Sequence, residues 1–174
     1  HARQSREESD AVIVKIIDGD GRAGYGESLP RSYVTRETTE SMIARIRDHL
    51  APKIFGQSFA PGWETLEYFQ SVHADWTRNE DRSVPVVAWN AAFCAVELAL
   101  LDWSLRGLHC SLADFLSPAR NEVVYSGVIS SNNPTEAAAL AKRMLELGLR
   151  QLNIKVGPAD DYERVAAVRL AGGD

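Results

Sequence analysis

The sequence predicts an α+β region over residues 1–120, followed over residues 121–174 by the first strand–helix units of a parallel sheet. A β-branched run beside a glycine-rich turn near residue 20 indicates a hairpin, and a long run of small and apolar residues near residue 95 indicates a central helix. After residue 120 the pattern changes to strand, helix, strand, helix. That order is typical of βαβ units, in which a helix joins two parallel strands.

Length and composition are those of a folded globular chain. There are 174 residues, of which 45% are hydrophobic and 25% are charged. Lys and Arg number 19 against 24 Asp and Glu, a net charge of −5, which argues against a nucleic-acid partner. The apolar stretches are much shorter than the ~20 residues of a membrane span, so we expect no membrane partner.

Cysteine usage favours a cytoplasmic location. Cys94 and Cys110 form no CxxC pair, and we expect both to be free buried thiols of a cytoplasmic protein. The chain begins at His1 without a signal-peptide pattern and stops at Asp174 directly after a helical pattern. We therefore expect both ends to be cut from a longer chain.

The first expected element is a β-hairpin formed by residues 11–17 and 22–27. Residues 19–24 carry the pattern GxGxxG, which also occurs in dinucleotide-binding proteins. That pattern binds phosphate where it opens a helix, and the segment leading to Pro30 cannot start one. We therefore interpret these glycines as hairpin-turn glycines. Residues 28–36 show no periodicity and are expected to form a loop.

Four helices are expected in the rest of the α+β region, over residues 37–50, 63–72, 86–106 and 113–116. We expect Pro52 to end the first helix, and the polar residues 73–83 to form a surface connection after the second. The third is the expected spine of this region, with Gly107 as its left-handed cap. Ser111 and Asp114 are the expected capping pair of the short fourth helix.

The second region is expected to hold strands over residues 123–129 and 151–156 and helices over residues 134–147 and 161–171. Asn133 is the expected N-cap of its first helix, Gly148 the end of that helix, and Asp160 the cap of the next. These ~54 residues cannot close a (β/α) barrel, which typically needs about 250. We expect the rest of the sheet to be missing from this chain or carried by another.

Two carboxylates and two histidines in the helices form no recognisable catalytic pattern. Glu97 and Asp102 lie in the apolar spine helix, but their spacing puts them on different faces, so we expect satisfied structural groups. His49 and His73 stand among polar residues and are expected on a solvated face.

Lys155 is the most informative residue. It lies near the carboxyl end of the second parallel strand, where active sites of (β/α) barrels are found. Strand alternation puts Asn153 and Lys155 on one face and Leu152, Ile154 and Val156 on the other. Two interpretations stay open on these grounds, a catalytic lysine and a surface lysine at an incomplete sheet edge.

In the hairpin, the spine helix and the segment around Lys155, the sequence resembles the enolase superfamily, in its mandelate racemase and muconate lactonizing enzyme branch. The resemblance spans nearly the whole chain in the right order. The matching residues are Asp20-Gly21, Gly24-Tyr25-Gly26-Glu27, Pro30-Arg31-Ser32-Tyr33-Val34-Thr35, Glu37, Glu97 through Asp102, Lys155-Val156-Gly157, Asp161, Glu163, Arg164 and Arg169.

The resemblance implies a capping domain made of a β-meander and helices, followed by a (β/α)7β TIM-like barrel. Enzymes of this family remove the proton α to a carboxylate and stabilise the enediolate on Mg²⁺. Lys155 matches the second lysine of the family's Lys-x-Lys motif, which implies a catalytic acid or base. Asn153 replaces the first lysine; it cannot act as a base but can donate a hydrogen bond to a substrate carboxylate. The family's metal ligands are expected beyond Asp174, so we expect none in this chain.

The loop after the hairpin resembles the family's capping-domain loop, which closes over the substrate. On this resemblance Arg31 or Tyr33 is expected to meet a distal group of the substrate, while Pro30 and Val34 exclude water. A plain surface loop is the competing interpretation.

The resemblance thus implies the N-terminal part of a Mg²⁺-dependent isomerase or lyase with a small carboxylate substrate, similar to a muconate cycloisomerase or an amino-acid or dipeptide epimerase. The resemblance also implies a homo-oligomer for the longer protein and no activity for these 174 residues alone. The alternative is a complete small α+β interaction module that recruits a partner through its exposed sheet edge.

Overall fold

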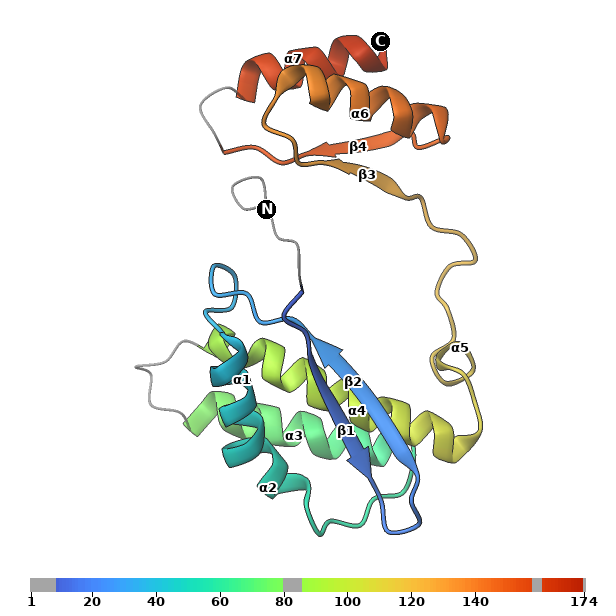
Figure 1. Ribbon diagram of the computed structural model, residues 1–174. Helices are drawn as coiled ribbons and strands as arrows, with labels where there is room; N and C mark the ends of the chain where they lie inside the picture. The colour runs from blue at the N-terminus through green and yellow to red at the C-terminus, as the bar shows by residue number, and fades with distance from the viewer. Residues whose placement is uncertain (1–8, 80–85, 158–160, 174) are drawn as a thin grey trace. The chain divides into compact units, whose positions relative to one another are not determined.

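The computed structural model describes residues 9–79, 86–157 and 161–173 (Figure 1). Within them the chain divides between Pro118 and Ala119 into two compact units. We refer to the part before this division as the first unit and to the part after it as the second unit.

The first unit opens with the expected hairpin. Strands β1 (Val12–Ile17) and β2 (Ala23–Ser28) pair antiparallel. The Asp18 carboxylate closes the turn, because one of its oxygens accepts the backbone N–H groups of Asp20 (3.0 Å) and Arg22 (2.9 Å). Gly21 adopts a φ of +81°, which favours glycine. The predicted hairpin is confirmed.

Helix α4 (Asn90–Leu108), which follows the 3₁₀ turn η2 (Val86–Trp89), packs across this hairpin. A Cβ at Gly24 would lie 2.3 Å from the Ala99 carbonyl oxygen, and one at Gly26 would lie 2.0 Å from the Ala95 carbonyl oxygen. The interpretation of Gly24 as a turn glycine was therefore wrong. It lets the strand approach the helix backbone closely.

The first helical segment is longer than predicted. It comprises α1 (Thr39–Arg45), the π-helical turn η1 (Ile46–Leu50) and α2 (Ala51–Ile54). Pro52 does not end this segment, because it occupies the first turn of α2. In the first turn of a helix the backbone N–H groups have no partner within the helix, so the N–H that proline lacks is not needed. The wider π turn before it, closed by the Ala51 N–H on the Ile46 oxygen, moves the preceding carbonyls out of an α-helical register.

Helix α3 (Trp63–Asn79) also exceeds its prediction. Residues 73–79, expected to form a surface connection, are helical, whereas residues 80–83 lie outside the described residues. The His73 ring meets the Phe93 ring edge-on at 4.5 Å, and the Trp76 and Trp89 rings lie 4.1 Å apart. His49 also contacts both tryptophans, at 5.1 and 5.2 Å. His49 is nevertheless exposed, as expected, whereas His73 is half-buried against Phe93, so the expectation of a solvated face was wrong for His73.

The end of α4 differs in its cap. The left-handed residue is His109, with a φ of +51°, and Gly107 lies inside the helix. A Cβ at Gly107 would lie 2.6 Å from Arg22 Nη1 and 2.7 Å from Pro61, so close packing explains this glycine. The predicted capping pair Ser111 and Asp114 is confirmed at α5 (Leu112–Phe115).

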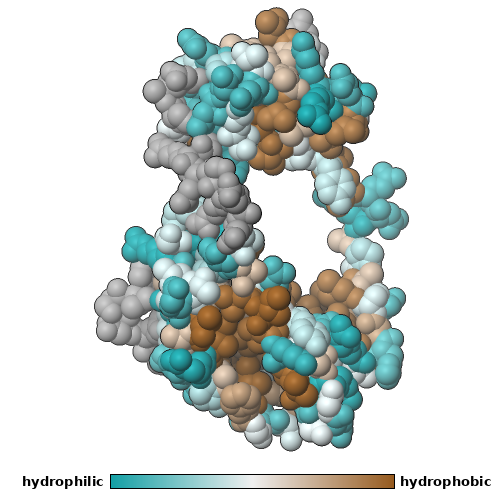
Figure 2. Space-filling view, in the orientation of Figure 1, coloured by the Kyte–Doolittle hydropathy of each residue, from teal (hydrophilic) through white to brown (hydrophobic). Residues whose placement is uncertain are grey.

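The surface of the first unit carries both expected and unexpected features. Cys94 is exposed and Cys110 half-buried, and both are free, so the expected burial of Cys94 was wrong. A cleft of about 770 Å³ beside β1 is lined mainly by apolar side chains, which gather on this face in Figure 2. Among the described residues, no helix has both the length and the apolar character needed to cross a bilayer.

The second unit has the expected βαβα order. Its elements are β3 (Ser126–Ile129), α6 (Pro134–Glu146), β4 (Gln151–Ile154) and α7 (Asp161–Gly172). The two strands are parallel, and both helices lie on the same side of them (Figure 1). Ile129, Ala137, Ala141 and Val168 form the buried core between sheet and helices. Asn133 caps α6 through its side-chain oxygen, as predicted.

The strands of this unit are shorter than predicted. Val123, Val124 and Tyr125 lie outside the sheet and are at least two-thirds exposed. They have apolar strand composition, but β3 pairs with β4 only from Ser126 onward. β4 ends at Ile154, and the expected cap Asp160 lies outside the described residues.

Candidate active site

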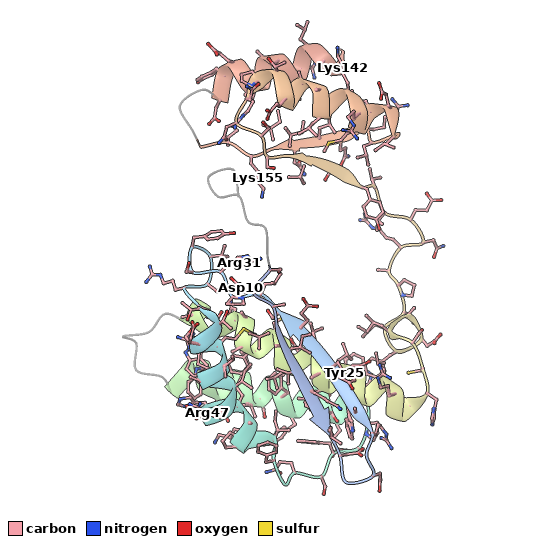
Figure 3. The ribbon with its side chains drawn as sticks, in the orientation of Figure 1. Asp10, Tyr25, Arg31, Arg47, Lys142 and Lys155 are labelled. Atoms are coloured by element: carbon pink, nitrogen blue, oxygen red, sulfur yellow. The ribbon has the colours of Figure 1, made fainter. Side chains whose placement is uncertain are left out.

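Lys155 directly follows β4, and both of its backbone polar groups are bonded. Its N–H donates to the Ile129 carbonyl oxygen at 3.0 Å, and its own carbonyl oxygen accepts from Arg164 Nη2 at 2.7 Å. The side chain is exposed and points away from α6 and α7 (Figure 3). The amine is therefore open to solvent, while the backbone that carries it is fixed.

Asn153 lies on the same face as Lys155, as the alternation predicts. Its Nδ2 donates to Ser126 Oγ across the strand pair at 2.9 Å. Leu152 and Ile154, on the opposite face, pack against the core of this unit. Val156 does not join them, because the strand has already ended and this side chain is 66% exposed.

A buried arginine that carried no role in the sequence prediction lies behind this face. Arg164 on α7 is 1% exposed and bonds to the loop after β3 as well as to Lys155. It also pairs with Asp161, whose second oxygen accepts the Gly157 N–H at 2.7 Å. A charged pair at helical spacing was visible in the sequence, but its burial was not.

The loop residues expected to bind substrate all lie in the first unit. Pro30 is buried, and Arg31 is half-buried with its Nη1 donating to the Pro30 oxygen at 3.0 Å. The Arg31 carbonyl accepts the N–H groups of Val34 and Thr35, both at 2.8 Å, which closes a tight turn. Tyr33 and Val34 are exposed at 50% and 59%. The loop thus presents one aromatic and one aliphatic side chain to solvent.

Glu37 anchors the far end of this loop, a role that sequence reasoning missed. It is 1% exposed, and its two oxygens accept the backbone N–H groups of Ala91 (2.8 Å) and Ala92 (3.1 Å) at the start of α4. Arg45 Nη1 lies 3.8 Å away. Trp89 gives α4 no side-chain cap, so the buried carboxylate supplies the missing acceptors. The absence of a capping residue before α4 was the available signal.

The two carboxylates of the spine helix form no catalytic pair. Asp102 accepts the Tyr25 N–H and Arg106 Nε, both at 2.9 Å, and so ties β2 to α4. Glu97, expected in an apolar setting, is exposed. The prediction that Asp102 is a satisfied structural group is confirmed.

Metal-ligating side chains do not cluster in the described part of the chain. No group of three His, Cys, Asp or Glu residues there lies close enough to hold an ion. The side chains of the described residues therefore do not fit a Mg²⁺ site.

Comparison with known proteins identifies relatives over most of the chain. A family model described as "Mandelate racemase / muconate lactonizing enzyme, N-terminal domain" matches residues 1–117. The L-Ala-D/L-Glu epimerase of Bacillus subtilis (strain 168) is 30% identical over 164 residues, 92% of this chain and 41% of the relative. The aromatic dipeptide epimerase of Herpetosiphon aurantiacus is 28% identical over 166 residues, 92% of this chain and 42% of the relative.

The structural likeness agrees with these sequence matches. The substrate-liganded complex of the B. subtilis L-Ala-D/L-Glu epimerase has a TM-score of 0.72 at 29% identity, covering 94% of this chain and 43% of that one. The chain therefore spans about two fifths of the length of the relatives that it matches.

Proposed function

Because the chain belongs to the mandelate racemase / muconate lactonizing enzyme family, we propose that it is the N-terminal part of an enzyme that removes the proton α to a carboxylate. The substrate class that fits best is a dipeptide or N-acylated amino acid, and the reaction is inversion at the α carbon. The names of the relatives support this class, since they include an L-Ala-D/L-Glu epimerase, an aromatic dipeptide epimerase and an N-succinyl-L-Arg/Lys racemase.

Lys155 is the observation that carries the proposal. Inversion requires a base that removes the α proton and a group that returns one to the other face of the carbon. A neutral amine at the open edge after β4 can accept such a proton, and the fixed backbone on either side of Lys155 limits where its Nζ can reach. Lys155 is therefore assigned the acid/base role on its face of the substrate.

Asn153 binds rather than reacts in this proposal. One hydrogen of its Nδ2 goes to Ser126, which orients the amide and leaves the second hydrogen for an acceptor on the open face. A substrate carboxylate is a suitable acceptor. Asn153 carries no charge and takes no proton, so Lys155 is the amine that transfers the proton at this strand end.

The loop residues Pro30, Arg31, Tyr33 and Val34 are proposed to contact the substrate away from the reacting carbon. The Arg31 guanidinium complements a second carboxylate, and the exposed Tyr33 and Val34 offer apolar contact to a side chain of the substrate. Glu37 bonds to the start of α4, so the end of the loop that carries these side chains is held in place.

Mg²⁺ enters this proposal through the family resemblance alone. When bound, such an ion stabilises the negative charge that develops on a carboxylate during proton removal. Its ligands would have to come from outside the described residues, and no step above is routed through it. A homo-oligomeric state is likewise proposed on the resemblance alone, and a cytoplasmic location on the cysteine usage of the sequence.

A substrate screen tests the proposal. The longer protein that contains this chain is incubated in D2O with Mg²⁺ and a panel of dipeptides, N-succinyl amino acids and muconate, and ¹H NMR follows loss of the α-proton signal. We expect exchange and inversion with at least one dipeptide or N-acyl amino acid. Turnover of muconate alone would contradict the proposed inversion and favour cycloisomerisation. No turnover of any compound in the panel would contradict the proposed function.

A further inference from the structure

Arg164 is the largest of the fully buried side chains in the described part of the chain. Taking a guanidinium out of water costs on the order of several kcal/mol, which good partners must offset. An apolar side chain of similar volume would fill the same space without that cost. Packing alone therefore does not explain an arginine at this position.

The partners of Arg164 come from three separate segments. Nη1 donates to the Ser131 carbonyl oxygen (3.3 Å) and to Asn132 Oδ1 (3.0 Å), both in the loop after β3. Nη2 donates to the Lys155 carbonyl oxygen (2.7 Å), directly after β4, and to the Asp161 carboxylate on its own helix. One side chain thus joins the carboxyl ends of both strands to the start of α7.

Asp161 extends this connection by one more residue. Its Oδ2 accepts the Gly157 N–H at 2.7 Å, while Oδ1 faces the guanidinium. Arg164 and Asp161 together hold the backbone on both sides of Val156. We call these two side chains the α7 clamp.

We propose that the α7 clamp is the positioning device of Lys155, with Arg164 as its central positioning residue. The proposal rests on the acid/base role proposed above for Lys155. The Lys155 N–H is held by Ile129 and its carbonyl by Arg164, so the direction in which the side chain leaves the backbone is fixed. Misplacing a reacting group by ~1 Å can cost about 100-fold in rate.

The planar fork of arginine suits this task. It offers five N–H donors in a rigid arrangement, which lets Nη1 and Nη2 serve different segments at once. A lysine at position 164 has a single ammonium at the end of a flexible stem and cannot span the same acceptors. Arg164→Lys keeps the charge and most of the volume of the side chain but removes its ability to bridge the segments, so this variant tests the bridging separately.

The first test measures the backbone and needs no substrate. In the longer protein, Arg164→Met is expected to speed amide hydrogen exchange at Lys155 and Gly157 about tenfold or more, since their segment loses its bridge. The Ala137 amide in α6, which donates to the Asn133 oxygen, is the internal reference and should not change. Arg169→Met, an exposed arginine on the same helix, is the matched control.

The second test measures kinetics with L-Ala-L-Glu or the dipeptide that the screen identifies. We expect Arg164→Met to lower kcat by about 100-fold while KM stays within about threefold, because substrate contacts are kept and the base is displaced. Arg164→Lys, which keeps the charge but cannot span the same acceptors, should not recover kcat. If Arg164→Met does not fold, Asp161→Asn is used instead, with faster Gly157 exchange and a roughly tenfold lower kcat expected.

The outcomes separate this proposal from the proposed function. Wild-type kcat in Arg164→Met, or in Asp161→Asn where that variant is used, overturns the clamp even if Lys155→Ala is inactive. A rescue of kcat by Arg164→Lys shows a merely structural role and also overturns it. If Lys155→Ala keeps wild-type kcat, the proposed function fails, and amide exchange at Gly157 still decides whether the clamp holds the backbone.

Discussion

Glu37 and Arg164 are nearly fully buried, and each bonds to backbone groups of segments distant in the sequence. Glu37 joins the loop before α1 to the start of α4, and Arg164 joins both strand ends of the second unit. Burial of a charge is decided by contacts between distant segments, so local sequence identifies neither residue; for Glu37 it shows only that α4 lacks a capping residue of its own. Lys155 could be predicted as a candidate site residue, because its position at the end of a parallel strand is a local property of the sequence.

Replacing Glu37 by Gln tests the first of these roles. The amide oxygen can accept only one of the two N–H groups of Ala91 and Ala92, and the other is left facing an amide NH2. We expect a loss of about 1–3 kcal/mol in the free energy of unfolding. Urea unfolding measures it, with the exposed Glu67→Gln on α3 as the control. Equal stability of both variants would contradict the anchor.

Asp18 makes the hairpin sensitive to acid. A hydrogen bond from Trp103 Nε1, followed by backbone N–H groups of Arg22 and Asp20, lowers the pKa of the Asp18 carboxyl below its ordinary value of 3.8, although partial desolvation opposes this. A lowered folded-state pKa stabilises the fold above about pH 3.8, and that contribution is lost as the pH falls through the lowered pKa.

The corresponding experiment compares Asp18→Asn with the wild-type chain between pH 7 and pH 2. We expect the variant to be less stable at neutral pH, and the difference in urea midpoint to shrink as the pH falls below about 3.8. Asp20→Asn in the same turn is the control. A difference that stays constant across this range would show that the charge of Asp18 does not contribute.

At the scale of elements, the first unit depends on how closely β2 lies against α4. Gly26→Ala would put a methyl group 2.0 Å from a helix carbonyl, and neither backbone can move without disturbing the other. We expect a loss of about 3 kcal/mol or more in unfolding free energy. Gly19→Ala, at a position with no neighbouring atom within 4 Å, is the control and should unfold close to the wild-type midpoint.

Element types were predicted more reliably than element ends. The hairpin, the α6 cap at Asn133 and the βαβα order follow from glycine turns, capping residues and apolar periodicity, all of which are local. Two errors arose where contacts between separate segments prevail: α3 continues past His73, which packs on Phe93, and strand pairing rather than composition sets the start of β3. The error at Pro52 is local, because a π turn lets the helical segment continue through the proline.

At the scale of the whole molecule, the predicted family and fold class are confirmed. The first unit is an α+β capping domain of the mandelate racemase / muconate lactonizing enzyme family, and a parallel βαβα unit follows it. Of the candidate site, strand alternation correctly placed Asn153 and Lys155 on one face. The substrate contacts of the loop residues Pro30, Arg31, Tyr33 and Val34 stay predictions.

These 174 residues alone are expected to show no Mg²⁺-dependent turnover of any dipeptide that the longer protein converts. The reason is that the family resemblance implies metal ligands beyond Asp174. The check is α-proton exchange in D2O with and without Mg²⁺, using the longer protein as the positive control. Metal-dependent exchange by the short chain that disappears in Lys155→Ala would contradict the expectation.

Lys155 is proposed to transfer the α proton, and α-proton exchange by the longer protein carrying Lys155→Ala measures this role. Both epimers of the converted dipeptide are followed by ¹H NMR in D2O, with Lys142→Ala, an exposed lysine on α6, as the matched control. We expect exchange of at least one epimer to fall by about 100-fold or more in Lys155→Ala and to stay at the wild-type rate in Lys142→Ala. Wild-type exchange of both epimers by Lys155→Ala would contradict the claim.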